Sequence, residues 1–258
     1  MEQLLNPAIN LMNRLNYPRK FILVGGLSLL SLLLVSLMLA MHLYATISLS
    51  NMQLDGLNQI YKLSNVIHSM QQRRGLSGGV LAGISVNKAE QATIQNNVKK
   101  HFRLVNSSLP KDMQTSKEWS TITGRWRYLN STNVTMGLND SFHSHTRLIQ
   151  RLLAFQRELA DYYQLPIVSD LNSHYLTNSF LSPLPISLEL LGKIRALGLT
   201  YLAHKNAVEI RKINALMSDL VPPVRVLKES AHKFLKIPGE AGELVHAKAN
   251  DFIRDIAE

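Results

Sequence analysis

The stretch FILVGGLSLLSLLLVSLMLAM, residues 21–41, contains no charged side chain. Because a helix rises about 1.5 Å per residue, a helix of this length crosses the roughly 30 Å hydrocarbon core of a bilayer. A cleaved signal peptide has a shorter apolar region, of about 7 to 15 residues, and a small-x-small cleavage site, which residues 42–45 do not supply. We therefore expect an uncleaved transmembrane helix over residues 21–43.

Charged residues on the two sides of this stretch indicate its orientation. The basic residues before it are Arg14, Arg19 and Lys20, and the next charge after it is Asp55. The positive-inside rule then places residues 1–20 in the cytoplasm and residues 44–258 on the other side of the membrane. No second apolar run of spanning length follows. We expect a single-pass chain that is either truncated before a second transmembrane helix and an output domain or complete only as an input module.

The composition sets bounds on the rest of the chain. A length of 258 residues with 46% hydrophobic residues provides enough apolar surface for a packed core. The formal net charge of +10 favours an anionic partner, such as nucleic acid, a membrane surface or an anionic ligand. A location outside the cytoplasm argues against nucleic acid. Because the chain contains no cysteine, disulfides, thiolate metal sites and thiol catalysis are excluded.

Apolar residues at helical spacing continue beyond the membrane segment. Steps of three and four join Leu57, Ile60, Leu63, Ile67 and Met70, which predicts an amphipathic helix that leaves the membrane directly. Residues expected to weaken or interrupt it are Gly75, Gly78, Gly79 and Gly83. Further helices are predicted over 87–106, 115–132, from Asp140 or Ser141 to Pro166, 171–182, 184 to about 217 and, after a break at Pro222 and Pro223, 224–258. No strand-like alternation is present, so the predicted fold class is all-α, an N-terminal transmembrane helix followed by an elongated up-and-down helical bundle.

Two arginines fall within these apolar stripes. The first stripe continues to Arg74 and Ser77, and the stripe of Leu184, Leu188 and Leu191 continues to Arg195 and Gly198. A buried guanidinium needs an acidic partner or a bound anion, and its planar fork suits carboxylate, nitrate or phosphate. We therefore hypothesise a site for a small anionic ligand, formed by Arg74, Arg195, Gly75, Ser77 and Gly198. The alternatives are that each arginine extends to solvent, lies at a frayed helix end, or pairs with a nearby acid such as Glu189.

Other motifs do not indicate a metal site or catalysis. His143 and His145 are two apart, so they do not share a helix face and no metal site is expected. Trp119 and Trp126 are seven apart, which is more typical of a helix core than of a nucleic-acid surface. Motifs such as G-x-S-x-G, H-E-x-x-H or a phosphate loop are missing from the sequence. We expect neither an enzyme nor a cofactor.

Several segments together resemble a known family. The sequence LMNRLNYPRKF, residues 11–21, resembles the amino terminus of a group of bacterial methyl-accepting chemotaxis proteins and related membrane sensor kinases and cyclases. The sequence QQRRGLS, residues 71–77, resembles their Q-x-x-R-G motif, which is similar to that of nitrate- and nitrite-sensing helical domains. HTRLI at 145–149, DLNSHYL at 170–176, LP at 184–185 and IRALG at 194–198 follow in similar order and spacing. The chain departs from the family pattern at LPIVS, residues 165–169, and at Arg73.

The resemblance implies a periplasmic sensor domain anchored in the bacterial inner membrane. A ligand that binds one packing of the bundle more tightly would shift helices by about 1–2 Å. A homodimer along the first outer helix is compatible with its heptad-like spacing. The family's methylation helices and kinase-coupling hairpin are not in this sequence, so chemotaxis output is implied only for a longer chain. The alternative is a membrane-tethered helical scaffold or assembly protein that binds protein partners or anionic envelope polymers.

Overall fold

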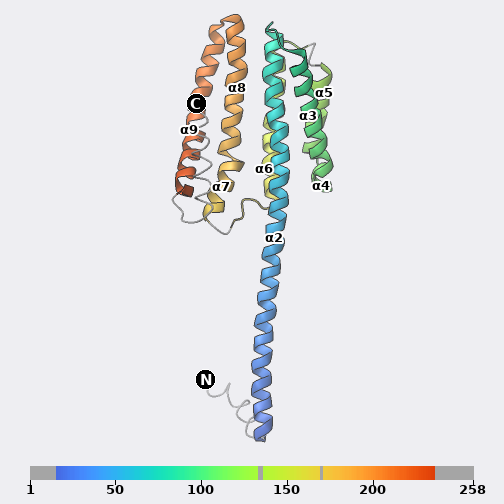
Figure 1. Ribbon diagram of the computed structural model, residues 1–258, viewed down its shortest axis with the longest axis vertical. Coiled ribbons are helices and arrows are strands. Elements are labelled where there is room, and N and C mark those ends of the chain that lie inside the picture. Colours follow the sequence, from blue (N-terminus) through green and yellow to red (C-terminus); the bar gives the residue numbers. More distant parts are fainter. Residues whose placement is uncertain (1–15, 133–135, 169–170, 236–258) are drawn as a thin grey trace. The chain divides into compact units, whose positions relative to one another are not determined.

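The computed structural model describes residues 16–132, 136–168 and 171–235 of the chain (Figure 1). These residues form helices joined by short turns, with no strand among them, which confirms the predicted all-α fold class. The chain divides into two compact units, residues 1–51 and residues 52–258.

The first unit contains the amino-terminal part of α2, a helix that spans Tyr17–Leu81. Its apolar side chains are exposed throughout residues 21–41, including those of Phe21, Leu32 and Met38. A core helix of a water-soluble protein would bury such side chains, because each large one that is buried contributes about 1.5–3 kcal/mol. Within the described residues, α2 alone is long and apolar enough to cross a membrane. The predicted transmembrane segment is therefore a candidate span by length, composition and exposure.

Helices α2, α3, α5 and α6 enclose the hydrophobic core of the second unit. The bounds of the last three are Lys88–Ser108, Lys117–Thr132 and Leu138–Tyr162, and a short α4 (Lys111–Gln114) precedes α5. They run alternately up and down in Figure 1. The core cluster includes Ile60, Met70, Trp119, Leu152 and Phe155. The predicted seven-residue pairing of Trp119 and Trp126 is a core feature, since both rings are buried.

Helices α7 (Leu171–Leu181), α8 (Pro183–His204) and α9 (Ala207–Leu235) complete the second unit. Pro183 starts α8, at a position where the missing backbone N–H needs no partner within the helix. Lys205, with a φ of 53°, ends α8 in the left-handed conformation, and its N–H donates to the carbonyl of Tyr201. Helix α9 then returns alongside α8 (Figure 1).

The carboxyl-terminal end of α2 differs from the prediction. Helix α2 is not interrupted at Gly75, Gly78 or Gly79 but continues to Leu81, and the turn follows at Gly83, whose φ is 82°. The three glycines are buried, so packing around α2 outweighs the roughly 1 kcal/mol that each glycine costs in a helix.

The start of α6 also differs from the prediction, because the helix begins after Gly137 and not at Asp140 or Ser141. Asp140 lies in the first helical turn, where a carboxylate interacts favourably with the helix dipole.

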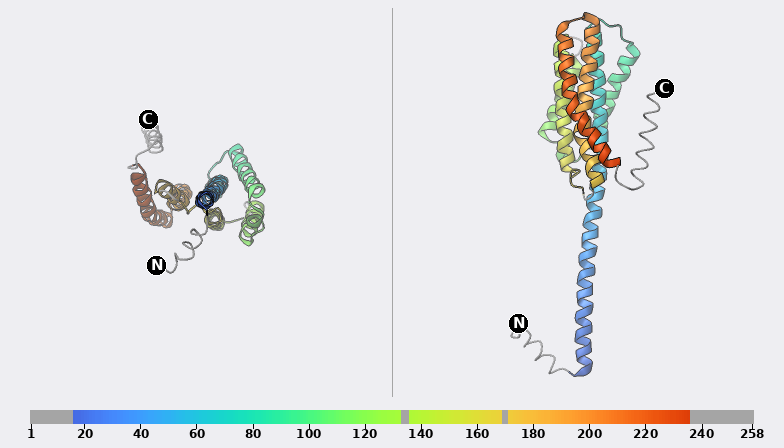
Figure 2. Two further views of the ribbon diagram at one scale, coloured as in Figure 1. Left: turned by 90° about the horizontal axis from the view of Figure 1, so that it is seen from below. Right: turned by 90° about the vertical axis from the view of Figure 1, so that its left-hand side faces the viewer.

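The predicted break at Pro222 and Pro223 is also wrong, because both prolines lie inside α9. Each removes an N–H that would bind a carbonyl one turn earlier, at Ser218 or Asp219. These residues are exposed, so water can bind the freed carbonyls, and α9 bends partway along its length in Figure 2. The chain breaks instead at Lys205 and Asn206, and residues 236–258 of the last predicted helix lie outside the described part of the chain.

The apolar stripe predicted for α8 faces solvent and not the interior of the unit. Leu188 and Leu191 are exposed, whereas Ser187, Glu189 and Ala196 are buried. The helix is therefore rotated relative to the phase that its leucines predict. The buried face of α8 includes Glu189, which forms an ion pair with an arginine of α2.

Candidate functional site

Arg74 is a fully buried side chain in the interior of the second unit, and 1% of its surface is exposed. Its Nη1 donates to Glu189 Oε1 at 2.6 Å and its Nη2 to Glu189 Oε2 at 3.2 Å, so α2 and α8 are joined by a two-pronged ion pair. Nη1 also donates to Thr146 Oγ1 of α6 at 3.1 Å. The ring of Phe142 lies 5.6 Å from the guanidinium carbon. Of the alternatives for this arginine, the structure shows the pairing with Glu189.

The surroundings of Glu189 accommodate this pair. Gln71 Nε2 donates to Glu189 Oε2 at 3.0 Å, and Lys193 Nζ lies 3.9 Å from Oε1. A Cβ atom at Gly192 would lie 2.9 Å from Arg74 Nη2, so a side chain there would displace the guanidinium. A buried ion pair needs additional hydrogen bonds, such as those from Gln71 to Glu189 and from Arg74 to Thr146, because each ion loses its hydration on burial.

Arg73, the neighbouring residue, is a second buried cation, which the spacing of apolar residues does not predict. It is 4% exposed, and its guanidinium carbon lies 4.8 Å from the ring centre of Trp126. Its Nη1 makes a long hydrogen bond of 3.5 Å to Asn130 Oδ1, and its Nε has no partner among the described residues. No carboxylate of the described chain lies within 4.0 Å of it. Burial lowers the pKa of Arg73 to about 10, so the side chain still carries its charge at pH 7.

His145 of α6 lies fully buried near both arginines. Its Nδ1 bonds to the carbonyl oxygen of Ser141 at 2.8 Å, which makes Nδ1 the protonated nitrogen and leaves Nε2, which has no partner among the described residues, as an acceptor. Its pKa is lowered to about 4, mainly by burial and to a smaller extent by the charges of Arg73 and Arg74, while the hydrogen bond to the Ser141 carbonyl acts in the opposite direction. The imidazole is therefore neutral at pH 7. His143 is exposed, so the two histidines do not face one site, and no cluster of three potential metal ligands occurs in the described chain.

The interior cluster, defined as Arg73, Arg74, His145 and Glu189, contains more positive than negative charge. The cluster contains two guanidinium groups and one carboxylate, which pairs with Arg74, and the imidazole contributes no charge at pH 7. Nε atoms of both arginines lack partners in the described chain, as does Nε2 of the histidine. An uncompensated buried charge is costly, whereas a small anion next to Arg73 would neutralise it and accept its free N–H.

The other predicted site residues lie in two places. Ser77 is buried and Gly198 is half-buried, while Arg195 is exposed. Arg195 and Gly75 line a cleft of about 370 Å³ together with residues of α3 such as Glu90. Arg74 is not among the lining residues, so the structure brings Arg195 together with Gly75 but gives Arg74 a different set of partners.

A sequence signal for Arg73 does exist. Gly75, Gly78 and Gly79 together with Ser69 and Ser77 place small residues on every face of α2, which is typical of a helix that is packed on all sides. In such a helix both consecutive arginines are buried, not only the one in phase with the apolar stripe. Comparisons with models of protein families, with curated proteins and with solved structures found no match to this chain.

Proposed function

We propose that residues 44–258 are the periplasmic ligand-sensing module of a bacterial inner-membrane signalling receptor, and that the interior cluster binds a small anion. The observation that carries this proposal is the excess positive charge around Arg73, a buried guanidinium that has no carboxylate partner in the described chain. The resemblance to chemotaxis receptors and related sensors supports the same kind of function.

The Arg74–Glu189 pair offers a route from binding to movement. In this proposal the anion also accepts from Arg74, the next residue on α2, and so competes with Glu189, which accepts from that guanidinium in the structure. Weakening the pair loosens the contact between α2 and α8 and favours a different packing of the two helices. Helix α2 contains Arg73 and Arg74 of the cluster as well as the candidate span, so a shift of α2 is the proposed signal.

Thermal stability of the detergent-solubilised full chain tests this proposal. Nitrate, phosphate and acetate are added as sodium salts against chloride at equal ionic strength, since a ligand that binds the folded state raises the melting temperature. We expect at least one anion to raise it in the wild type but not in Arg73→Gln. An exposed arginine on α9, in the variant Arg211→Gln, is the matched control and keeps the response. Equal shifts in both variants, or no shift with any anion, would contradict the proposal.

The proposed receptor is a homodimer along α2. Leu54, Leu57 and Tyr61 recur at steps of three and four on α2, and all three are exposed. Ile60 and Leu63 point instead into the core of the same chain. The exposed stripe is the face that a second copy would cover, since an apolar seam at this spacing is what interhelical packing requires.

A further inference from the structure

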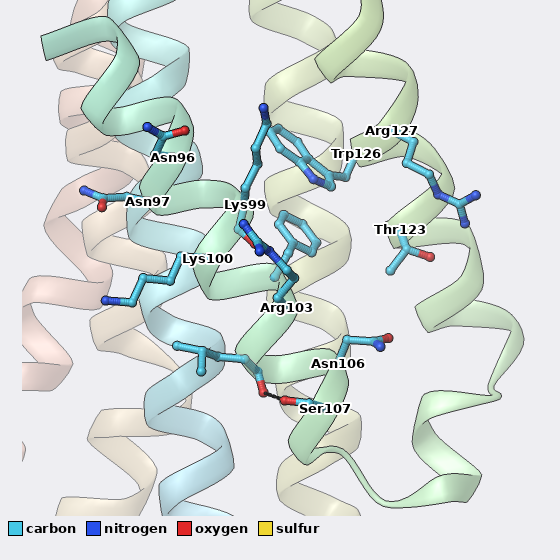
Figure 3. Close-up of a pocket in the computed structure, with 12 residues that line it drawn as sticks. Asn96, Asn97, Lys99, Lys100, Arg103, Asn106, Ser107, Thr123, Trp126 and Arg127 are labelled. Atoms are coloured by element: carbon cyan, nitrogen blue, oxygen red, sulfur yellow. Dashed lines mark hydrogen bonds between the residues drawn. The ribbon is translucent and has the colours of Figure 1, made fainter. Parts of the chain in front are cut away.

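A wide groove between α3 and α5 collects positive charge on the surface of the second unit (Figure 3). It has a volume of about 1110 Å³. Its cations are Lys99, Lys100, Arg103 and Arg127, and no acidic residue lines it. These four residues define what is called the basic groove.

The cations of the basic groove are not neutralised by the described part of the protein. No carboxylate of the described residues lies within 4.0 Å of any of them. The acid of the adjoining helix, Glu118, is already bound to Arg151 of α6 at 2.9 Å. Lys100, Arg103 and Arg127 are exposed, and like charges about one helical turn apart repel each other. Such an arrangement weakens the fold slightly and attracts anions from solution.

Neutral hydrogen-bonding groups alternate with these charges. Asn96 and Asn97 line the groove, and neither side chain is hydrogen-bonded within the described chain. Asn106 accepts a hydrogen bond from Trp119 Nε1 at 2.9 Å through its Oδ1, which leaves its NH₂ group as a donor. From Asn96 to Ser107 the lining residues of α3 extend over about 16 Å at 1.5 Å per residue. The groove therefore suits an extended ligand with both charged and neutral polar groups.

The floor of the groove is formed by two aromatic rings whose faces are not accessible to a ligand. The rings of Phe102 and Trp126 stack on each other with centres 5.2 Å apart, and they are 5% and 8% exposed. Proteins that bind single-stranded nucleic acid use exposed aromatic faces on which the bases stack. Neither ring offers such a face, so the groove recognises its ligand by charge and hydrogen bonds along the surface.

From these observations we infer that the basic groove binds a strand of acidic polysaccharide. Lys and Arg side chains of the groove bind the carboxylate, sulfate or phosphate groups of the strand, and the asparagine amides bind its hydroxyl groups. This site is separate from the interior cluster, because none of the cluster residues lines the groove. Polysaccharide binding therefore does not depend on anion binding at the cluster, although both require the second unit to lie outside the cytoplasm.

Binding of fluorescent heparin oligosaccharides to the detergent-solubilised full chain tests the inference. The groove variant is Lys100→Gln, Arg103→Gln and Arg127→Gln combined. The matched control removes the same charge from exposed positions of α9, as Arg211→Gln, Arg225→Gln and Lys228→Gln. We expect the groove variant to bind heparin at least tenfold more weakly than the wild type and the control to stay within about twofold. Binding should weaken as salt is raised, and neutral dextran should not bind.

Three results would overturn the inference. Equal loss in the groove and control variants would mean that heparin responds only to net charge. Tighter groove-dependent binding of poly-dT than of heparin would assign the groove to nucleic acid, and groove-dependent binding of phosphatidylglycerol vesicles without heparin binding would assign it to a lipid surface. Circular dichroism and melting temperature of each variant establish that the compared proteins are folded.

Discussion

Glu189 holds Arg74 in the interior, and its removal should be among the most damaging single changes in the second unit. The variant Glu189→Gln keeps the shape of the side chain but leaves the guanidinium without a counter-charge. We expect the free energy of unfolding to fall by about 3–5 kcal/mol, because a charge buried without its partner keeps its full desolvation cost. Chemical denaturation of the solubilised chain measures this change.

The ion pair between Glu118 and Arg151 provides a control of the same chemistry. Their side chains are 27% and 39% exposed, and Nη1 lies 2.9 Å from Oε1. The variant Glu118→Gln should therefore cost only about 0–1 kcal/mol, as is usual for pairs in contact with water. Similar losses for the two variants would show that Arg74 is not held in a water-excluded interior.

The buried imidazole of His145 predicts a loss of stability in acid. In the unfolded chain this residue takes up a proton as the pH falls through 6.5, whereas in the folded chain its pKa is about 4. Between these two pH values the unfolded state binds more protons than the folded state. The free energy of unfolding therefore decreases as the pH is lowered from 6.5 to 4, by about 3 kcal/mol in total. The variant His145→Asn should flatten the melting profile between pH 6.5 and 4, and His143→Asn, at an exposed position, should not. An unchanged slope in His145→Asn would show that another group causes the acid sensitivity.

Sequence spacing alone identified Arg74 as a buried cation but could not find Arg73. The three-and-four rule assumes that a helix has one buried face, and Arg73 lies off that face. In the structure, burial near residue 73 extends well beyond the apolar stripe, and only Gln72 and Leu76 are half-buried among residues 71–79. Glu189 was named only as one possible partner, since a side-chain pair between residues so far apart in the chain cannot be derived from local pattern. The proposed ligand-binding role of Arg195, Gly75, Ser77 and Gly198 stays a prediction.

Helix α2 contains one glycine that packing requires and another that it does not. A Cβ atom at Gly56 would collide with the side chain of Tyr163 and lie 3.1 Å from Leu165 Cδ2, whereas a Cβ atom at Gly75 would meet no atom within 4 Å. Gly56→Ala should therefore destabilise the chain by about 1–3 kcal/mol through overpacking. Gly75→Ala should stabilise it by up to about 1 kcal/mol, because alanine favours the helix. Denaturation of both variants measures the difference, and equal effects would mean that α2 does not approach Tyr163 closely.

The helices themselves were largely predictable, because long amphipathic periods dominate α3, α5 and α6. Errors arose where tertiary contacts overrule local preference. The rotation of α8 buries a charged residue, Glu189, which pairs with Arg74, and leaves Leu188 and Leu191 exposed. The continuation of α9 through Pro222 and Pro223 depends on exposed carbonyls that water can bind. Hydrophobic period and proline position cannot report either effect.

Dimerisation along α2 can be tested in the assembled protein, because the chain contains no cysteine and each introduced thiol is unique. Leu57→Cys and Tyr61→Cys place a thiol on the exposed stripe, and Ile60→Cys places one in the core. Oxidation in native membranes should cross-link the first two variants and leave the third monomeric. Monomers in all three variants would reject a dimer along this face.

The position of the chain in the membrane is tested by the same cysteine-free background. Asn16 lies on the amino-terminal side of the candidate span, and Tyr128 is an exposed residue of α5 in the second unit. In intact spheroplasts a membrane-impermeant maleimide should label Tyr128→Cys but label Asn16→Cys only after lysis, because the positive-inside rule predicts a cytoplasmic amino terminus. Adding Leu33→Arg should reduce insertion in both backgrounds, since a charge at the centre of a span costs about 2.5–3.5 kcal/mol. If Tyr128→Cys were labelled only after lysis, the second unit would face the cytoplasm, and neither a periplasmic anion nor an envelope polysaccharide could reach it.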